Sequence, residues 1–281
     1  MKINDLLRER SKRVENVLCL GLDPAPARIP IEESSAVEAS RVFLSKIVEA
    51  LGDKVAAVKP NSAFFEQLGP KGIELLVDLV GQAKERGIPV ILDAKRGDIG
   101  STAKAYAKFV FDLVDADLVT LSPFLGEDSL EPFFERCSGG EKGCYLLNRT
   151  SNPGGAQFQN LLIEDGRPLY LHTTDAIARW NRRWGASIGA VVGATAVDEF
   201  DEISKAYHDT GIELPLLIPG VGTQGGDPAK VVELLRERNL LSLARVNSSS
   251  GILYAYEEDR GGDWLDACAR EVDRLSRLLA L

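Results

Sequence analysis

The sequence contains few residues of the kinds that hold metals or form disulfides. It has four cysteines and two histidines in 281 residues. The cysteines are scattered, with no C-x-x-C pair and no histidine at ligand spacing, which favours packed, reduced thiols over a zinc site or disulfides. His172 and His208 have no paired nucleophile, so we expect neither to be catalytic. No G-x-S-x-G, Walker A or H-E-x-x-H run occurs, which excludes serine hydrolases, P-loop enzymes and zincins.

Basic residues and long apolar runs are also scarce. Lysine and arginine total 33 against 42 acidic residues, a net charge of −9, and such a chain lacks the basic face that nucleic acids or anionic membranes require. No stretch approaches the length of a membrane span, and residues 1–16 are charged, without the apolar core of a signal peptide. We therefore predict a cytoplasmic protein with no nucleic-acid or membrane partner, in which local cations hold any anionic substrate.

Short apolar runs are what the sequence has instead. Eight of them lie at residues 17–22, 55–59, 88–95, 117–122, 143–148, 188–195, 214–220 and 241–247. Amphipathic stretches with helical spacing separate most of them, and this alternation predicts a parallel sheet. Eight repeats in a chain of this size predict a (β/α)₈ TIM barrel. A doubly wound open sheet is the alternative.

The barrel is expected to occupy residues 1–281 as a single domain, with two additions. One is an extra helix at the N-terminus. The other is an insertion after strand 5, at residues 151–185, which mixes turn residues with a helical tail. This composition predicts an elaborated loop rather than a second domain.

The run "VILDAKRGDIGST" sets charged residues directly after an apolar strand. Asp93 and Lys95 are two residues apart, so they would face the same side at the barrel mouth, where active sites of this fold lie, with Ala94 facing away. Nearby carboxylates would keep Lys95 an ammonium, able to donate a proton. The alternative for a lone D-x-K is an ion pair at a strand end, and Asp98 alone is better explained as an N-cap of the next helix.

A glycine-rich run, "LLIPGVGTQGGDPAK", contains G-x-G-x-x-G at residues 220–225. It lies late in the chain, and no carboxylate ends the next strand, so a Rossmann fingerprint is excluded. After strand 7 of a barrel, its backbone N–H groups could hold a phosphate, or the run could be only a turn. Gln224 favours a ligand, and Asp227 with Pro228 predicts a helix N-cap and the first helical residue.

The runs "LDAKRGDIGSTA", "VKPNSAFFE", "NRTSNPG" and "IPGVGTQGG" together resemble orotidine 5′-phosphate decarboxylase, in particular its longer bacterial-type branch. They occur in the expected order between Asp23 and about Ala255. The resemblance implies a TIM barrel that converts orotidine 5′-monophosphate to UMP in de novo pyrimidine biosynthesis. It also implies that no metal or organic cofactor is used, and that the enzyme is a homodimer with shared active sites.

The same resemblance implies roles for the D-x-K-x-x-D residues. Lys95 would protonate C6 of the pyrimidine as CO₂ leaves, because a fixed ammonium stabilises the carbanion that develops there. Asp93 would lie near the substrate carboxylate. Asp98, with Ile99 and Thr102, would reach into the partner subunit's site.

Other residues would bind the nucleotide, again by resemblance. Asp23 and Lys59 would hold ribose hydroxyls and complete the charged network. Ser151 would contact the pyrimidine. Gln224 would span base and phosphate, and Gly222 would supply backbone N–H contacts to the phosphate.

One position departs from the family pattern. An arginine usually clamps the phosphate in a run resembling S-S-R-x-I, whereas this chain reads "VNSSSGILYA", with Ser250 at that place. A serine cannot replace a bidentate guanidinium. Three explanations stay open: residues 248–250 hold the phosphate with backbone N–H groups, another cation such as Arg149, Arg245 or Arg260 takes over, or binding is weaker.

Two other functions stay open as well. Related barrels share D-x-K-x-x-D and add Mg²⁺, so a keto-sugar phosphate is an alternative substrate. The missing arginine also suggests a non-catalytic binder of a nucleotide or phosphosugar. This last hypothesis is the least favoured, because Asp93, Lys95 and Asp98 are all present.

Overall fold

The computed structural model describes residues 1–221, 225–258 and 262–281, and it confirms the predicted barrel. Each of the eight apolar runs contains a strand or most of one. The strands are β1 (Leu18–Gly21), β2 (Ala57–Lys59), β3 (Ile91–Arg96), β4 (Leu118–Leu121), β5 (Gly143–Arg149), β6 (Ser187–Val192), β7 (Leu216–Ile218) and β8 (Ala244–Ser248). All paired strands run parallel, in the order β2-β1-β8-β7-β6-β5-β4-β3.

The two ends of this sheet meet through isolated contacts between β2 and β3. Val58 bridges Val90, and Asn61 bridges Asp93, both in parallel register. The Asp93 N–H also donates to the Pro60 carbonyl at 2.9 Å. The barrel therefore closes beside Asp93, whose backbone is bonded to the segment that follows β2.

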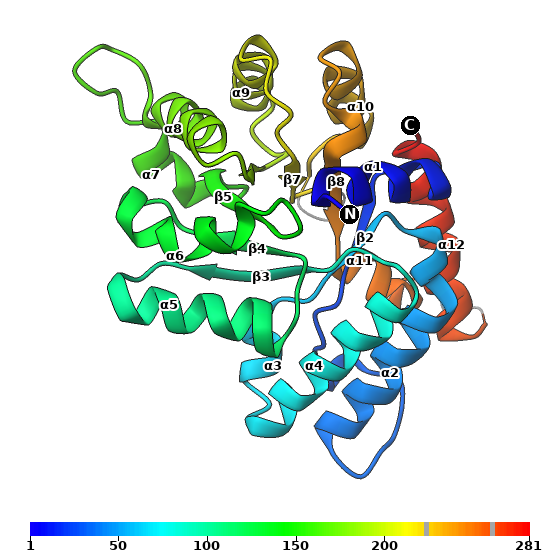
Figure 1. Cartoon of the computed structure of the whole chain (residues 1–281). Coiled ribbons are helices and arrows are strands. Elements are labelled where there is room, and N and C mark those ends of the chain that lie inside the picture. The colour runs from blue at the N-terminus through cyan, green and yellow to red at the C-terminus, as the bar shows by residue number, and fades with distance from the viewer. Residues whose placement is uncertain (222–224, 259–261) are drawn as a thin grey trace.

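Helices surround the strands (Figure 1). The longer ones are α1 (Ile3–Val14), α2 (Ala36–Leu51), α4 (Pro70–Glu85), α5 (Gly100–Lys108), α6 (Glu127–Cys137), α8 (Leu169–Trp184), α9 (Val197–Asp209), α10 (Pro228–Glu237) and α12 (Trp264–Leu278), and the short ones are α3 (Ser62–Glu66), α7 (Ala156–Gln159) and α11 (Ser250–Leu253). Asp227 is the N-cap of α10, where its carboxylate accepts from two backbone N–H groups, and Pro228 is the first helical residue, as predicted.

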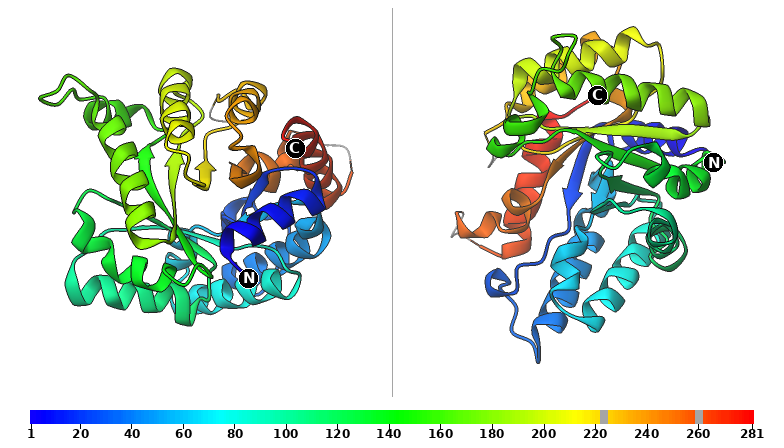
Figure 2. Two further views of the ribbon diagram at one scale, coloured as in Figure 1. Left: turned by 45° about the horizontal axis from the view of Figure 1, so that its top comes forward. Right: turned by 90° about the vertical axis from the view of Figure 1, so that its left-hand side faces the viewer.

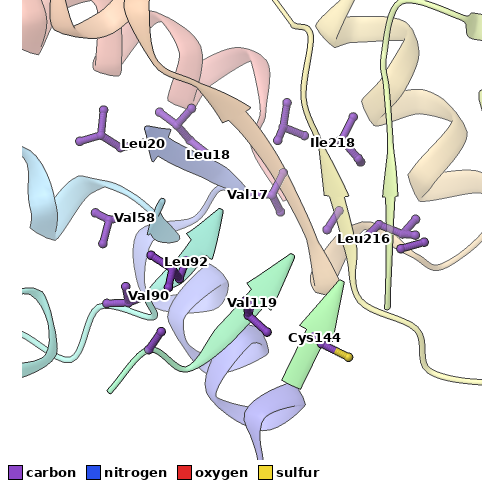
Figure 3. Close-up of a cluster of buried hydrophobic side chains, with 14 of the residues drawn as sticks. Val17, Leu18, Leu20, Val58, Val90, Leu92, Val119, Cys144, Leu216 and Ile218 are labelled. Atoms are coloured by element: carbon purple, nitrogen blue, oxygen red, sulfur yellow. The ribbon is translucent and has the colours of Figure 1, made fainter. Parts of the chain in front are cut away.

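Alternating side chains along the strands form two cores. One fills the barrel interior, and it includes Cys19, Ala57, Ile91, Leu118, Tyr145, Val191 and Leu217. The other lies between the strands and the helices, and Figure 3 shows part of it, including Leu20, Val58, Leu92, Val119 and Ile218. Ile3 and Leu7 of α1 join the interior core, so the extra N-terminal helix packs on the barrel interior.

The insertion after β5 has the predicted character. It begins with a 3₁₀ turn (Pro153–Gly155) and α7, and it ends in α8, the helical tail. The segment between α7 and α8 projects from the body in Figures 1 and 2. All four cysteines are free and buried, as expected. Among the described residues, no helix has the length and apolar content needed to cross a membrane.

Candidate active site

The carboxyl ends of the strands surround a cavity of about 490 Å³. Most strands send an inward-facing side chain into it, because every second residue of a barrel strand points to the interior. These side chains are Lys59, Asp93, Lys95, Thr120, Leu147, Val191, Leu217 and Asn247. Loop residues complete the wall: Asp23, Asn61, Thr150, Ser151, Asn152, Pro219, Gly220, Val221 and Ser248 to Ser250. Five predicted site residues, namely Asp23, Lys59, Asp93, Lys95 and Ser151, therefore share one cavity with Ser250.

Lys59, Asp93 and Lys95 form a charged row on one side of this cavity. Lys59 Nζ lies 2.8 Å from Asp93 Oδ2, and Lys95 Nζ lies 2.6 Å from Asp93 Oδ1. The Lys59 side chain is 4% exposed and that of Asp93 is 10% exposed, whereas that of Lys95 is 48% exposed. Of these two lysines, Lys95 is thus the one whose ammonium faces open space.

Burial and neighbouring charges shift the pKa values of Asp93 and Lys59 in opposite directions. Burial alone would raise the pKa of Asp93, but Lys59 and Lys95 outweigh it and hold that pKa well below its usual value. Burial would likewise lower the pKa of Lys59, but Asp93 and Asp23 raise it above the usual value. Both residues therefore stay charged at neutral pH, because each buried charge has partners of opposite sign.

Asp23 joins the row from the loop after β1. Its Oδ1 accepts from the Asn61 N–H at 3.1 Å, and its backbone carbonyl accepts from the Tyr254 hydroxyl at 3.2 Å. The Asn61 side chain in turn caps α3. The sequence prediction missed Asn61 and Thr120 as members of this site. Their signal was a polar side chain at the end of an apolar strand, as for Lys59.

Asp98 and Thr102 lie apart from the cavity of their own chain. Within the described residues, neither lines it. The interpretation of Asp98 as an N-cap is wrong: the cap position of α5 is Ile99, and Asp98 Oδ1 accepts from the N–H of Ile99, which precedes the helix. Asp98 is half-buried and Thr102 is exposed, so their proposed roles depend on a second subunit.

Ser151 is held at the cavity by the loop that follows β6. Its carbonyl accepts from the Thr195 hydroxyl at 2.8 Å. A Cβ at Gly193 would meet the Ser151 backbone nitrogen at 2.7 Å, so the loop after β6 can approach Ser151 only with glycine there. Gly222 and Gln224, the expected contacts to phosphate and base, lie outside the described residues.

Two of the three arginines considered as substitutes at Ser250 are committed elsewhere. Arg245 is fully buried in the barrel and donates to the carbonyls of Ala244 and Leu7. Arg149 is also buried, donating to the Thr150 carbonyl at 2.6 Å and pairing with Glu199 at 3.3 Å. Arg260 lies outside the described residues.

A second cavity of about 720 Å³ adjoins the first and shares Ser248 and Ser250 with it. Arg28, Arg270 and Arg274 line it, as do Glu257, Glu258 and Glu271. Arg28 pairs with Glu257 at 2.6 Å and lies over the Tyr254 ring. Among the described residues that line this cavity, the three arginines are balanced by three glutamates.

Comparison with known proteins identifies the family. The model of the orotidine 5′-phosphate decarboxylase / HUMPS family matches residues 16–255, which include every strand and the whole charged row. The chain belongs to this family. Its relatives include the orotidine 5′-phosphate decarboxylase of Herpetosiphon aurantiacus, which is 45% identical over 258 residues, 92% of this chain and 90% of the relative. The chain is accordingly an enzyme of the carboxy-lyase class.

Solved structures give the same result. The structure of Leishmania donovani OMP decarboxylase superposes with a TM-score of 0.79 at 32% identity, covering 99% of this chain and 98% of that one. The UMP synthase of the same organism superposes with a TM-score of 0.80 at 33% identity, and this chain spans 56% of its length.

Among the described residues of our chain, no group of three or more His, Cys, Asp or Glu side chains could hold a metal ion.

Proposed function

We propose that the chain decarboxylates orotidine 5′-monophosphate to UMP in de novo pyrimidine biosynthesis, in the cytoplasm and without metal or organic cofactor. It acts as one barrel domain over residues 1–281. The observation that carries the proposal is the row Lys59–Asp93–Lys95, which ends in an exposed ammonium at the cavity of a chain from this family.

The proposed chemistry follows from that ammonium. The bond between C6 and the carboxylate breaks, CO₂ leaves, and the electron pair stays on C6. Lys95 stabilises the developing carbanion and transfers one Nζ proton to it, after which its neutral amine takes a proton from solvent. Lys59 cannot take this role, since its side chain is buried and bonded to Asp93. Asp93 holds Lys95 at 2.6 Å and lies near the substrate carboxylate.

The other groups bind the nucleotide. Asp23 and Lys59 hold the ribose hydroxyls, and Ser151 contacts the pyrimidine. The phosphate lies at the end of β8, where Ser248 to Ser250 provide hydroxyl and backbone donors. The commitment of Arg149 and Arg245 to partners elsewhere supports these neutral donors over either of those two guanidinium groups.

We further propose a homodimer in which the neighbouring subunit completes each site. Among the described residues that line the cavity, Asp98, Ile99 and Thr102 do not occur, and Ile99 is an apolar residue 58% exposed. An exposed apolar side chain beside polar side chains that do not line the subunit's own cavity is typical of a protein–protein interface. Asp98 and Thr102 would then reach the charged row of the partner.

Lys95→Ala tests the mechanism. We expect turnover to fall by more than about a thousandfold, because the variant loses both the electrostatic stabilisation and the proton donor. Loss of absorbance of orotidine 5′-monophosphate is followed with and without EDTA. Lys205→Ala, which removes a surface lysine paired with Asp209, is the control and should match the wild type. Substantial turnover by Lys95→Ala contradicts the mechanism. If the wild type leaves orotidine 5′-monophosphate unchanged but converts a keto-sugar phosphate in a reaction that EDTA abolishes and Mg²⁺ restores, the keto-sugar phosphate alternative is indicated.

Ser250→Arg tests how the phosphate is held. A guanidinium there adds charged hydrogen bonds, which are worth about 1.5–3 kcal/mol, so KM should fall by about tenfold or more. Ser250→Ala should raise KM only modestly, because two other serines and the backbone remain. Arg260→Ala is the comparison. If that variant raises KM far more than Ser250→Ala does, the phosphate is held by a cation and the serine proposal is wrong.

A further inference from the structure

Thr120 on β4 contacts both Asp93 and Lys95 of β3 through its single hydroxyl group. It faces the barrel interior, is 1% exposed and lines the cavity. Its Oγ1 donates to Asp93 Oδ1 at 2.9 Å and accepts from the backbone N–H of Lys95 at 2.9 Å. A hydroxyl can do both, since it carries one proton and two lone pairs.

The backbone that Thr120 holds is unusual. Lys95 has φ of 45°, the left-handed region that non-glycine residues seldom adopt. The register between β3 and β4 also shifts here: Leu92 pairs with Val119, but Arg96 pairs with Leu121. Four steps along β3 thus oppose two along β4, a bulge that redirects the side chains within it. Thr120 is the β4 residue inside this bulge.

Both carboxylate oxygens of Asp93 accept hydrogen bonds in this arrangement. Oδ2 accepts from Lys59, and Oδ1 accepts from Lys95 and from Thr120. If Lys95 gives its proton to the substrate, its charge no longer holds Oδ1. The bond from Thr120 persists through that step and keeps the carboxylate in place for reprotonation of the lysine.

We infer that Thr120 is a positioning residue of the decarboxylation, which fixes the Asp93 carboxylate and the bulged backbone of Lys95 relative to one another. The inference rests on the proposed function. It adds a residue from a third strand, which acts through Asp93 and Lys95. A small displacement of an acid from the reacting carbon is costly, so loss of this hydroxyl should lower kcat by about 10- to 100-fold.

Thr120→Val tests the inference, because valine keeps the shape of threonine and lacks the hydroxyl. We expect kcat to fall as stated, with KM for orotidine 5′-monophosphate little changed. Thr120→Ser keeps the hydroxyl and should restore kcat to near the wild-type value. A residue that served stability alone would lower the melting temperature without this division between kcat and KM. Thr120 as a substrate ligand would mainly raise KM, which also overturns the inference.

Folding is checked by circular dichroism and by calorimetric binding of UMP. If Thr120→Val does not fold, Thr120→Ala removes the same hydroxyl without placing a methyl group against Asp93, and its kcat decides. Wild-type kcat in a folded hydroxyl-free variant overturns the inference while the proposed function stands. Absence of turnover in the wild type itself overturns the proposed function, and the inference falls with it.

Discussion

At the scale of single residues, the difference in burial between Lys59 and Lys95 gives these two lysines different roles. Lys59 and Lys95 each contact one oxygen of Asp93, at 2.8 and 2.6 Å. Lys59, which is buried in the cavity wall, acts as the fixed counter-charge of Asp93, whereas the half-exposed Lys95 can deliver a proton to a substrate. A buried carboxylate between two cations is stabilised only while it is ionised, and this makes the stability of the protein depend on pH.

Asp93→Asn should lower the free energy of unfolding by about 3–5 kcal/mol at pH 7, because it leaves the buried Lys59 without its closest partner. Asp93 has a folded-state pKa below its unfolded value of about 3.9, so its contribution is present above that value and is lost as pH falls below it. The difference between wild type and variant should therefore narrow from pH 5 to pH 3. Urea unfolding at each pH measures it.

Asp209→Asn is the matched control for this pH dependence. Asp209 pairs with Lys205 on the surface of α9, and exposed ion pairs contribute little to stability because water screens them. Its effect should stay small at every pH. A difference between wild type and Asp93→Asn that is constant from pH 7 to pH 3 would contradict the assignment of a stabilised, charged Asp93.

At the scale of elements, the sequence predicts what is local and misses what is set across strands. Local sequence predicts the eight strands, the N-cap at Asp227 and the helical tail of the insertion, because apolar periodicity and turn residues act within a few positions. The positions of Asp93 and Lys95 on one side followed from the two-residue repeat of a strand.

The geometry behind that placement could not be predicted from the same repeat. β3 is bulged, with Lys95 at positive φ, and a partner on β4 stabilises this conformation. The helix after it begins at Gly100, two residues beyond Asp98, because Ile99 is still extended, with φ of −113° and ψ of 158°. The bulge depends on a contact between Lys95 and Thr120, which are 25 positions apart in the chain, and such a contact is not encoded in local spacing.

At the scale of the molecule, exposed apolar side chains lie on the loops close to Asp98 and Thr102, two predicted site residues that are not among the described residues lining the cavity of their own chain. Phe124 is 86% exposed, Leu125 is 46% exposed and Ile99 is 58% exposed. The loops that carry them are joined by the Ser122 N–H, which donates to the Arg96 carbonyl at 2.8 Å. Apolar surface of this kind beside Asp98 supports the proposed dimer interface.

If Phe124 lies in the proposed dimer interface, Phe124→Glu should yield a monomer, because a carboxylate in an apolar interface is desolvated without a partner. Light scattering after size-exclusion chromatography measures the mass. Activity should fall with the dimer fraction, since Asp98 and Thr102 would no longer reach a neighbouring site. Leu278→Glu, on α12 at 39% exposure, is the control and should remain dimeric and active. A Phe124→Glu monomer with full activity would contradict shared sites.

Mixing two inactive variants distinguishes active sites that are completed by the partner subunit from sites that are formed within one subunit of a dimer. Lys95→Ala removes the acid of a subunit's own site, and Asp98→Ala removes the group lent to its neighbour. In a mixed dimer, one site carries both defects and the other carries neither. Random exchange makes half of the dimers mixed, with one intact site each, so activity should return to about a quarter of the wild-type value. If Asp98 acts within its own subunit, every site keeps one defect and mixing restores nothing.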